Sequence, residues 1–329
     1  GPAGTMWTNS GASTPYVAGT PLTTIWVTPT VSSTYGVSFT TLTPCVSAVT
    51  NVPITVVQPV SSVVNPANRS VCVGGSTTFT ASASGGPLTY QWQLSTDGGL
   101  TYNNITGATA SSYTVSGATL SMTGYRYRCV FTAAPCAGST ASTGAILTVN
   151  ALPVVTLSSS DLSLIPGQST SITATSTPAA AAGGWVWSYN GNTISGNNTN
   201  TVSGITVDQL GAYHATVTDI NGCSNTSADL VVSAEASDRL WIYPNPTEGA
   251  FQVRLYYDPS TTAELRRVFL YNAQGQLIES RDFALTNSAP YLRMDFDLSR
   301  QADGTYVVKV VHKYTGKIVA SSLVRQTND

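Results

Sequence analysis

Histidine and serine are the residue types in this chain that could build a catalytic or metal-binding site. The two histidines, His214 and His312, lie far apart in the sequence, and neither belongs to the spacing of a zinc site or a catalytic triad. Serines are abundant, but none stands in a Gly-x-Ser-x-Gly turn. His214 follows Tyr213 on a predicted strand and should face the opposite side, as a solvated or hydrogen-bonded imidazole. The sequence therefore predicts no catalytic residue, no bound metal and no cofactor.

Acidic residues in the first two thirds of the chain are isolated from one another. The segments Asp97-Gly98-Gly99 and Asp219-Ile220-Asn221-Gly222 have the composition of tight turns between strands. A calcium site is the alternative interpretation of these turns, but one carboxylate without neighbouring oxygen ligands binds calcium weakly. We therefore expect structural turns at both places.

Length and composition favour several all-β domains in series. The chain has 329 residues, and a single hydrophobic core stops growing near 250 to 300 residues. Charged residues make up only 9%, and 28 glycines and 17 prolines accompany many Ser, Thr and Val residues, which favours strands and turns. No apolar run is long enough to span a bilayer as a helix, and a formal net charge of -2 offers no basic surface for nucleic acid.

Charge is distributed unevenly along the chain. Residues 238–329 hold 11 of the 14 Lys and Arg residues and 10 of the 16 Asp and Glu residues. In this segment apolar residues alternate in Phe251/Val253/Leu255, in Val268/Leu270 and in Tyr306/Val308/Val310, between Gly, Pro and Asn residues. This period of two is typical of half-buried antiparallel strands, so the segment predicts a small β-sandwich of its own.

The blocks of this last segment also resemble a known family. In order, they are Leu240 to Pro246, Gly249 to Val253, Val268 to Ile278, Asp303 to Val310 and Gly316 to Ala320. Their order and spacing resemble the type A C-terminal sorting domain of the type IX secretion system of Bacteroidota. A motif is as specific as its context, and here all the blocks agree. The matching residues are Tyr243, Pro244, Asn245, Pro246, Gly249 and Phe251 in the opening motif, Gly275 in a central turn, and Gly304 and Tyr306 in a late motif.

This resemblance implies a role in export. A sorting domain of this kind guides its cargo through the outer membrane, where a β-barrel shuttle protein recognises it. A sortase-like protease then usually removes it and attaches the cargo to surface lipopolysaccharide. The end of this chain departs from the family, whose members tend to finish on a Lys-containing apolar strand, because it reads Ser322-Leu323-Val324-Arg325 and then four more residues. Turn formation by the prolines and glycines, with Tyr306 in a core, is the purely structural alternative for these positions.

Two blocks upstream repeat each other with a period of about 90 residues. Residues 72–93 and 165–187 align so that Gly74 matches Gly167, Phe79 matches Ile172 and Trp92 matches Trp187, and further on Tyr127 matches Tyr213. A Trp on the third strand and a Tyr entering the sixth resemble the immunoglobulin-like sandwich, as found in tandem in surface and secreted proteins of the same bacteria. We therefore expect immunoglobulin-like domains at 59–151 and 152–236, before the sorting domain at 237–329.

Residues 1–58 fit the same plan only from the third strand onward. Met6-Trp7 occupies the Trp strand, Thr34 to Val37 the Tyr strand, and Ile54 to Val57 the last strand. An incomplete sandwich would expose unpaired backbone groups, and the chain begins Gly1-Pro2-Ala3 without a Met or a signal peptide. We expect this segment to be a partial domain at the start of a fragment of a longer protein.

Cysteines recur at one place in the repeats. Cys45, Cys136 and Cys223 each precede the final strand, and only the middle repeat has an upstream candidate, Cys72. We predict a Cys72–Cys136 disulfide, worth about 4 kcal/mol in chain entropy, with Cys129 as the alternative partner of Cys72. The matching position to Cys72 in the third repeat is Ile165, which leaves Cys223 without a predicted partner, and any partner of Cys45 should lie upstream. Disulfides suit an extracytoplasmic compartment.

Aromatic residues raise the question of a sugar-binding platform. By pattern, Trp92, Trp187, Tyr127 and Tyr213 belong to cores. For the others exposed cross-strand pairing is expected, with carbohydrate stacking as the alternative; these are Tyr90, Tyr102, Tyr113, Tyr125, Trp185 and Tyr189. Arg126 and Arg128 alternate on one strand as expected solvated residues, with a polar binding strip as the alternative.

These features predict a secreted or cell-surface, non-catalytic stalk or adhesin. Short joints at Gln58-Pro59, Asn150 to Pro153 and Ala234 to Ser237 restrict bending between domains, so a semi-rigid row is expected. The joint at Ala234 to Asp238 is the expected site at which the sorting domain is removed. The expected partners are the type IX machinery at the outer membrane and, more loosely, surface lipopolysaccharide or glycan. The alternatives are the spacer and sorting region of an exported hydrolase, and a carbohydrate-binding module.

Overall fold

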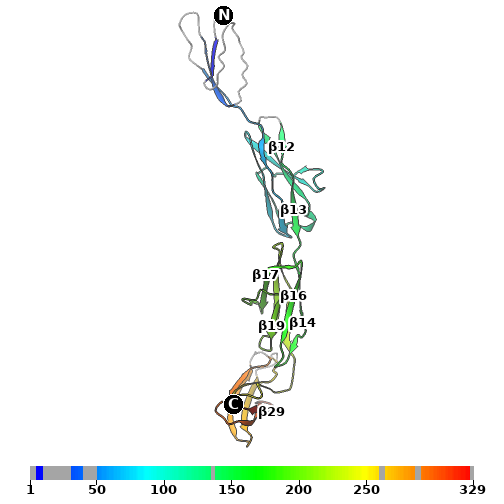
Figure 1. Ribbon diagram of the computed structural model, residues 1–329, viewed down its shortest axis with the longest axis vertical. Coiled ribbons are helices and arrows are strands. Elements are labelled where there is room, and N and C mark those ends of the chain that lie inside the picture. The colour runs from blue at the N-terminus through cyan, green and yellow to red at the C-terminus, as the bar shows by residue number, and fades with distance from the viewer. Residues whose placement is uncertain are drawn as a thin grey trace. The chain divides into compact units, whose positions relative to one another are not determined.

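A computed structural model describes residues 5–9, 31–39, 50–134, 138–258, 264–285 and 290–326 (Figure 1). The chain divides into two compact units, Gly1–Ala151 and Leu152–Asp329. Strands dominate the described residues, and the helical element among them is the short 3-10 helix η1 (Leu120–Met122). The prediction of an all-β fold is confirmed.

The first segment forms an antiparallel sheet in the order β1-β2-β3. Its strands are β1 (Thr5–Asn9), β2 (Ser33–Phe39) and β3 (Thr50–Ile54). The predicted Trp and Tyr strands are therefore neighbours, with Trp7 opposite Val37. The last strand begins at Thr50 and ends at Ile54, earlier than the predicted Ile54 to Val57.

The second segment is a sandwich whose larger sheet has the order β5-β13-β11-β8-β9, with β12 paired to β11. Smaller pairs β10-β6 and β4-β7 complete it. Figure 1 labels β12 and β13 in this sandwich. The strands are β4 (Ser61–Val64), β5 (Arg69–Cys72), β6 (Thr77–Thr80), β7 (Ser82–Ser84), β8 (Leu88–Ser95), β9 (Asn103–Asn104), β10 (Ser112–Val115), β11 (Arg126–Ala133), β12 (Ser139–Ala141) and β13 (Ala145–Asn150).

Alternation along β11 builds the core of the second sandwich. Every second residue of β11 is buried, and Cys129 lies directly opposite Trp92 of β8. Trp92 is fully buried, and its indole nitrogen donates to the carbonyl of Ala110 at 2.9 Å. Phe79 stacks on Tyr127 with ring centroids 4.7 Å apart. The Trp and Tyr predicted to be core residues therefore pack in one cluster.

The third segment repeats this plan. One sheet has the order β14-β16-β19, and the other has the order β15-β22-β20-β17-β18, with β21 paired to β20. The strands are β14 (Val154–Ser159), β15 (Ser163–Leu164), β16 (Thr170–Thr177), β17 (Ala180–Tyr189), β18 (Asn192–Thr193), β19 (Thr201–Ile205), β20 (Gly211–Asp219), β21 (Ser224–Thr226) and β22 (Leu230–Ala234). Trp187 is fully buried, and the Tyr213 hydroxyl donates to the carbonyl of Gln209 at 2.7 Å. This is the tyrosine corner of immunoglobulin-like sandwiches.

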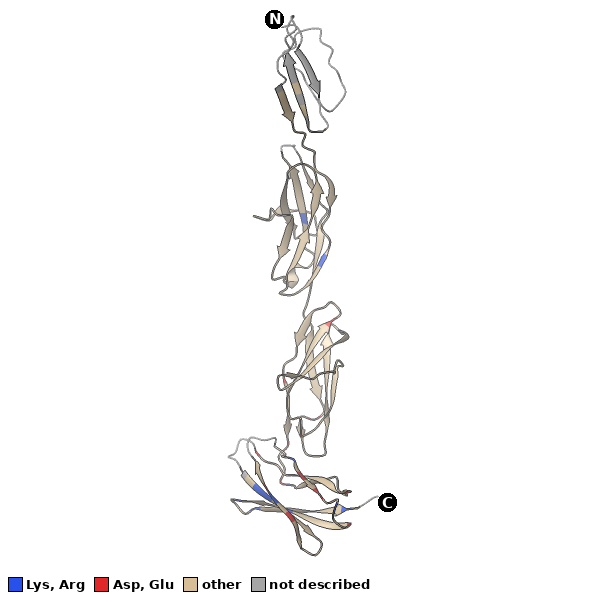
Figure 2. Ribbon diagram, turned by 90° about the vertical axis from the view of Figure 1, so that its left-hand side faces the viewer, with Lys and Arg blue, Asp and Glu red and all other residues tan. Residues whose placement is uncertain are grey.

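The last segment is a sandwich of a different topology. Its sheets have the orders β23-β24-β27 and β26-β25-β28-β29. The strands are β23 (Trp241–Tyr243), β24 (Ala250–Arg254), β25 (Glu264–Asn272), β26 (Leu277–Leu285), β27 (Met294–Asp297), β28 (Gly304–His312) and β29 (Ile318–Arg325). Phe251, Val268, Val308 and Leu323 meet in its core, as their alternation predicts. Lys, Arg, Asp and Glu residues are frequent in this sandwich, as the blue and red ribbon segments of Figure 2 show.

Candidate functional site

The opening motif of the last sandwich is a turn that binds the final strand. Tyr243 ends β23, and Pro244, Asn245 and Pro246 follow it. The Asn245 side chain accepts a hydrogen bond from the backbone nitrogen of Val324 at 3.0 Å and donates to the carbonyl of Ser322 at 3.2 Å. Because a proline nitrogen cannot donate, the side chain between the two prolines supplies hydrogen bonds that their backbone cannot. Asn245 therefore fastens the motif to β29.

Thr247 continues this pairing on the backbone. Its nitrogen donates to the carbonyl of Val324 at 2.9 Å, and its carbonyl accepts from the nitrogen of Gln326 at 3.0 Å. Its hydroxyl donates to the carbonyl of Ala250 at 2.7 Å and lies 3.1 Å from the nitrogen of Gly249, which donates to it. The side chain is only 2% exposed, so these bonds satisfy a buried hydroxyl.

Gly249 and Phe251 occupy their positions in the opening motif for different structural reasons. A Cβ on Gly249 would lie 3.0 Å from the Cα of Ser299, so the close approach of the two loops favours glycine here. Phe251 is 4% exposed and stacks on Phe296 with centroids 5.7 Å apart. The first residue lets two loops meet, and the second anchors the strand in the core.

The central and late motifs also set the geometry of the sandwich. Gly275 has a φ of +77° in the turn between β25 and β26, where its nitrogen donates to the carbonyl of Asn272 at 3.0 Å. Gly304 has a φ of +152° and begins β28. Two residues later, the hydroxyl of buried Tyr306 donates to the carbonyl of Ala302 at 2.6 Å. This is the same corner that Tyr213 forms in the preceding sandwich.

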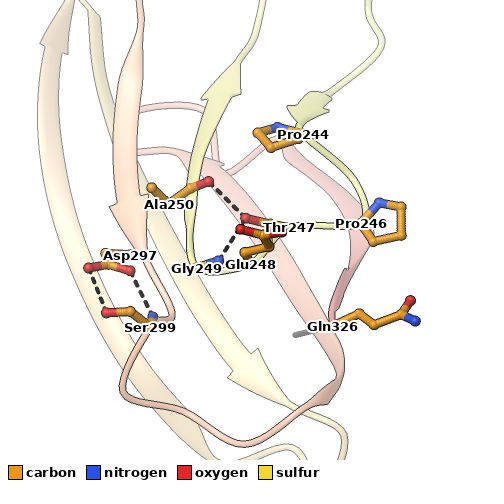
Figure 3. Close-up of a pocket in the computed structure, with 9 residues that line it drawn as sticks. All are labelled: Pro244, Pro246, Thr247, Glu248, Gly249, Ala250, Asp297, Ser299 and Gln326. Atoms are coloured by element: carbon orange, nitrogen blue, oxygen red, sulfur yellow. Dashed lines mark hydrogen bonds between the residues drawn. The ribbon is translucent and has the colours of Figure 1, made fainter. Parts of the chain in front are cut away.

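The turn of the opening motif borders a pocket of about 700 Å³ (Figure 3). It is lined by Pro244, Pro246, Thr247, Glu248, Gly249, Ala250, Asp297, Ser299 and Gln326. Three of the predicted sorting-motif positions, Pro244, Pro246 and Gly249, line it, while Phe251, Gly275 and Tyr306 serve the core and turns. Sequence reasoning missed the contributions of Asp297, Ser299 and Gln326. The short Asp-x-Ser spacing was the available signal for the first two, and Gln326 had none.

Asp297 supplies a negative charge at one wall of the pocket. Its carboxylate accepts the backbone nitrogen of Ser299 at 2.7 Å and the Ser299 hydroxyl at 2.9 Å, as drawn in Figure 3. The backbone bond first, and then the side-chain bond, lower the pKa of Asp297 below its usual range. The carboxylate is therefore ionised and fixed in orientation.

Arg325 occupies the position where the family tends to have a lysine-containing strand. It pairs with Asp303, donates to the carbonyl of Ser299, and its side chain is 9% exposed. Arginine supports several hydrogen bonds in fixed directions. The different ending of this chain is therefore built into the sandwich beside the pocket.

The histidines are not brought together. His214 lies on β20, with Nδ1 3.0 Å from a carboxylate oxygen of Asp229. His312 ends β28, where its Nδ1 accepts the backbone nitrogens of Tyr314 and Thr315 at 3.2 and 3.1 Å. The described part of the chain contains no cluster of three His, Cys, Asp or Glu side chains suited to a metal ion.

Asp97 acts within its own turn. Its carboxylate accepts the Ser95 hydroxyl at 2.7 Å and the backbone nitrogen and hydroxyl of Thr101 at 2.9 and 2.5 Å. The hydrogen bonds from Ser95 and then Thr101 lower the pKa of Asp97 well below its usual range. Asp219 similarly accepts the backbone nitrogens of Asn221 and Cys223 at 2.8 and 2.9 Å. Both carboxylates support turns, as predicted for these segments.

The prediction that the remaining aromatic side chains are exposed is wrong. Tyr90 packs edge-on against Phe131 at 5.5 Å, and Tyr113 stacks on Tyr127 at 5.7 Å. Arg128 lies 3.9 Å above the Tyr102 ring, which it covers. Tyr90, Tyr102, Tyr113, Tyr125 and Tyr189 are half-buried, and Trp185 is buried. None of the six is exposed, so they lack the exposure that the sugar-binding interpretation requires.

One prediction about cysteines is wrong, and one alternative is excluded. Cys223 carries a disulfide bond, although the sequence assigned it no partner, and Cys129 is a buried free thiol, which excludes it as the alternative partner of Cys72. Burial raises the pKa of the Cys129 thiol to about 11. Cys72 is disulfide-bonded, as predicted. Cys136 lies outside the described residues, so the Cys72–Cys136 pairing stays a prediction, and Cys223 is the other candidate partner of Cys72.

Comparison with known proteins places the site in a family. Residues 241–324 match the family described as a secretion system C-terminal sorting domain, and residues 62–151 match a domain of unknown function. Endoglucanase C of Cellulomonas fimi is 43% identical over 108 residues, which are 32% of this chain and 9% of that protein. The chain thus spans less than a tenth of the curated relative it matches.

Solved structures similar to the chain include tandem immunoglobulin domains. Sidekick-1 immunoglobulin domains 1-5 align with a TM-score of 0.33 at 15% identity, over 98% of this chain and 73% of that one. Latent PorU from Porphyromonas gingivalis aligns with a TM-score of 0.24 at 11% identity, over 83% of this chain and 34% of that one. Within the residues described, no helix is long and apolar enough to cross a membrane. Residues 241–324 are a C-terminal sorting domain of the type IX secretion system, and the chain is therefore a secreted or cell-surface protein exported by that system.

Proposed function

We propose that this chain is the C-terminal part of a larger surface protein of the adhesin or stalk type. Its immunoglobulin-like sandwiches act as non-catalytic spacers, and its last sandwich acts as the export signal. The observation that carries the proposal is the family match at residues 241–324, whose opening motif builds one wall of a pocket. The proposed domains are residues 1–58, 59–151, 152–236 and 237–329.

The pocket beside the opening motif is the proposed contact site for the outer-membrane machinery. Its walls combine two prolines, the fixed carboxylate of Asp297 and an exposed carboxylate on Glu248. A rigid site of this kind loses little conformational entropy on binding. The proposed partners are the shuttle barrel and the sortase-like protease, with attachment to surface lipopolysaccharide after removal of the sorting domain at the joint of residues 234–238.

Deletion of residues 238–329 tests the export role in the native host. The truncated protein should stay inside the cell envelope, because the sandwich that the machinery recognises is gone. Normal secretion of the truncated protein would refute the proposal. Secreted protein that ends near residue 237 in the wild type would support removal at the joint.

Replacing one of two alanines with arginine tests the pocket itself. Ala250 is exposed and lines the pocket, so Ala250→Arg fills it without removing a side-chain hydrogen bond. Ala284 is an exposed alanine on β26 of the same sandwich, and Ala284→Arg is the matched control. Secretion should fall for Ala250→Arg and stay normal for Ala284→Arg. Equal secretion of both variants would assign recognition to another surface.

The identity with Endoglucanase C favours a second candidate function. In this alternative, the repeats are spacers and the sorting domain exports a hydrolase whose catalytic domain lies elsewhere in the parent protein. The parent reading frame distinguishes the two. Further Trp- and Tyr-containing repeats would favour the stalk, whereas a constellation of His, Asp and Glu residues in a separate domain, with hydrolysis of a β-glucan by the full protein, would favour the enzyme.

A further inference from the structure

The C-terminal sandwich contains a buried arginine whose carboxylate partner belongs to the preceding sandwich. Arg254 ends β24, and its side chain is only 1% exposed. Its two terminal nitrogens donate to the two carboxylate oxygens of Asp208 at 2.6 and 2.7 Å. Asp208 lies between β19 and β20, in the turn that precedes the tyrosine corner. This two-point pairing is the strong geometry for arginine and a carboxylate.

The remaining contacts of Arg254 come from its own sandwich. Its Nε donates to the Gln252 side chain at 2.8 Å, and one terminal nitrogen also donates to the carbonyl of Tyr291 at 3.0 Å. The Gln252 side chain and the Tyr291 carbonyl are neutral, so Asp208 supplies the negative charge that pairs with the Arg254 guanidinium. Since a buried charge without a partner is strongly destabilising, the Arg254 position depends on the preceding sandwich.

Tyr291 makes a second connection between the same two sandwiches. It is fully buried and packs in the hydrophobic cluster of the preceding sandwich, together with Trp187 and Tyr213. Tyr256 contacts its ring edge-on at 5.6 Å. The Tyr291 hydroxyl donates to the carbonyl of Glu235 at 2.6 Å. An aromatic anchor and an ion pair whose arginine is buried therefore lie on one contact surface.

These contacts restrain the joint between the sandwiches. The Glu235 nitrogen donates to the carbonyl of Leu164 at 2.9 Å, while its carbonyl accepts from Tyr291. Leu240, which is 5% exposed, is held in the next core. Between these two anchors, Ala236, Asp238 and Arg239 are exposed. A protease needs an extended segment of backbone, and a restrained segment is cut mainly through local opening.

We propose that Arg254–Asp208 and Tyr291–Glu235 form a latch that shields the joint at residues 236–239 from proteolysis. The latch has to open before the sorting domain is cut from its cargo. Only this last step rests on the proposed removal at the joint. The shielding itself is a property of the purified chain. Engagement of the last sandwich by the export machinery is then the event that would release the restrained backbone at the cleavage site.

Limited trypsin digestion of the full chain measures the opening of the latch. Trypsin cuts after Arg239, and mass spectrometry quantifies the fragment that ends there. When opening is fast relative to cutting, the cleavage rate follows the population of the open form, so we expect a rise of about tenfold for Asp208→Asn and about fivefold for Tyr291→Phe. Asp229→Asn is the control, because Asp229 is an exposed carboxylate on the same sandwich that contacts the His214 ring, and its replacement should leave the rate unchanged.

Two results would overturn the latch. The first is an unchanged rate of cleavage after Arg239 in both Asp208→Asn and Tyr291→Phe. The second is an equal rise in cleavage after Lys309, in the middle of β28, which would indicate global unfolding instead of local opening. Loss of export on deletion of residues 238–329 is a separate observation, so failure of the latch and failure of the proposed export role can be told apart.

Discussion

Replacement of Asn245 should loosen the final strand of the sorting domain. Its side chain makes one hydrogen bond to Val324 and one to Ser322, and each contributes about 1 kcal/mol net. Asn245→Ala removes both bonds, so local opening of this edge should become easier by about 2 kcal/mol, roughly a 30-fold change in the opening equilibrium. Asn245→Asp keeps the acceptor for Val324 but loses the donor to Ser322, so we expect about 1 kcal/mol, roughly fivefold.

Hydrogen exchange of the full chain measures this change where it occurs. The amide of Val324 should exchange faster by these factors, because local opening governs the exchange of a hydrogen-bonded amide. A single unfolding midpoint is less informative, since several domains do not unfold as one two-state unit. Gln274→Ala, an exposed change in the turn between β25 and β26, is the control.

Exchange at Val324 that is the same in wild type and Asn245→Ala would refute this reasoning. It would mean that the pairing of β29 with β28 and the backbone bonds of Thr247 hold β29 in place without Asn245. Faster exchange across β25 and β28 as well would also contradict the local assignment, since the predicted opening is confined to the edge strand.

Three further predictions concern other parts of the chain. Gly249→Ala should destabilise the last sandwich by about 1 to 3 kcal/mol, because its Cβ would crowd the facing loop, and unchanged hydrogen exchange of the last sandwich would contradict this. Because the pKa of Asp97 is lowered in the folded state, its carboxylate stabilises the second sandwich at pH values above the ordinary carboxyl pKa. This stabilisation should be lost progressively as the pH falls below the ordinary carboxyl pKa. Asp97→Asn should remove this contribution to the acid sensitivity in a series of melting temperatures measured against pH. Alkylation without reductant should leave Cys72 and Cys223 unlabelled, and peptide mapping that joins Cys72 to Cys223 would refute the predicted Cys72–Cys136 pairing.

Local sequence signals predicted the strands and their inner faces well. In β11, β20 and β28 the buried residues alternate as the apolar pattern predicts, because side chains of a strand point to opposite faces in turn. The prolines and glycines of the opening motif mark turns for the same local reason. The aligned Trp92 and Trp187 also occupy equivalent core positions.

The same signals failed where the environment of a side chain is set by distant residues. Tyr113 is half-buried because Tyr127 stacks on it, and Tyr102 is covered by Arg128. Cys223 has a disulfide that its position in the repeat did not predict. A pattern along one strand identifies its inner face, but it does not identify which side chains of other strands cover the outer face.

The sequence by itself determined the all-β class, the repeated sandwiches and the sorting domain, because period, turn residues and motif order are properties of short segments. Only the tertiary structure decided that Asn245 binds β29, that Asp208 neutralises Arg254 and that Tyr291 closes on Glu235. These partners lie 79, 46 and 56 residues apart. Hydrogen bonds and ion pairs act over a few ångströms, so they depend on which strands and loops the completed fold brings together.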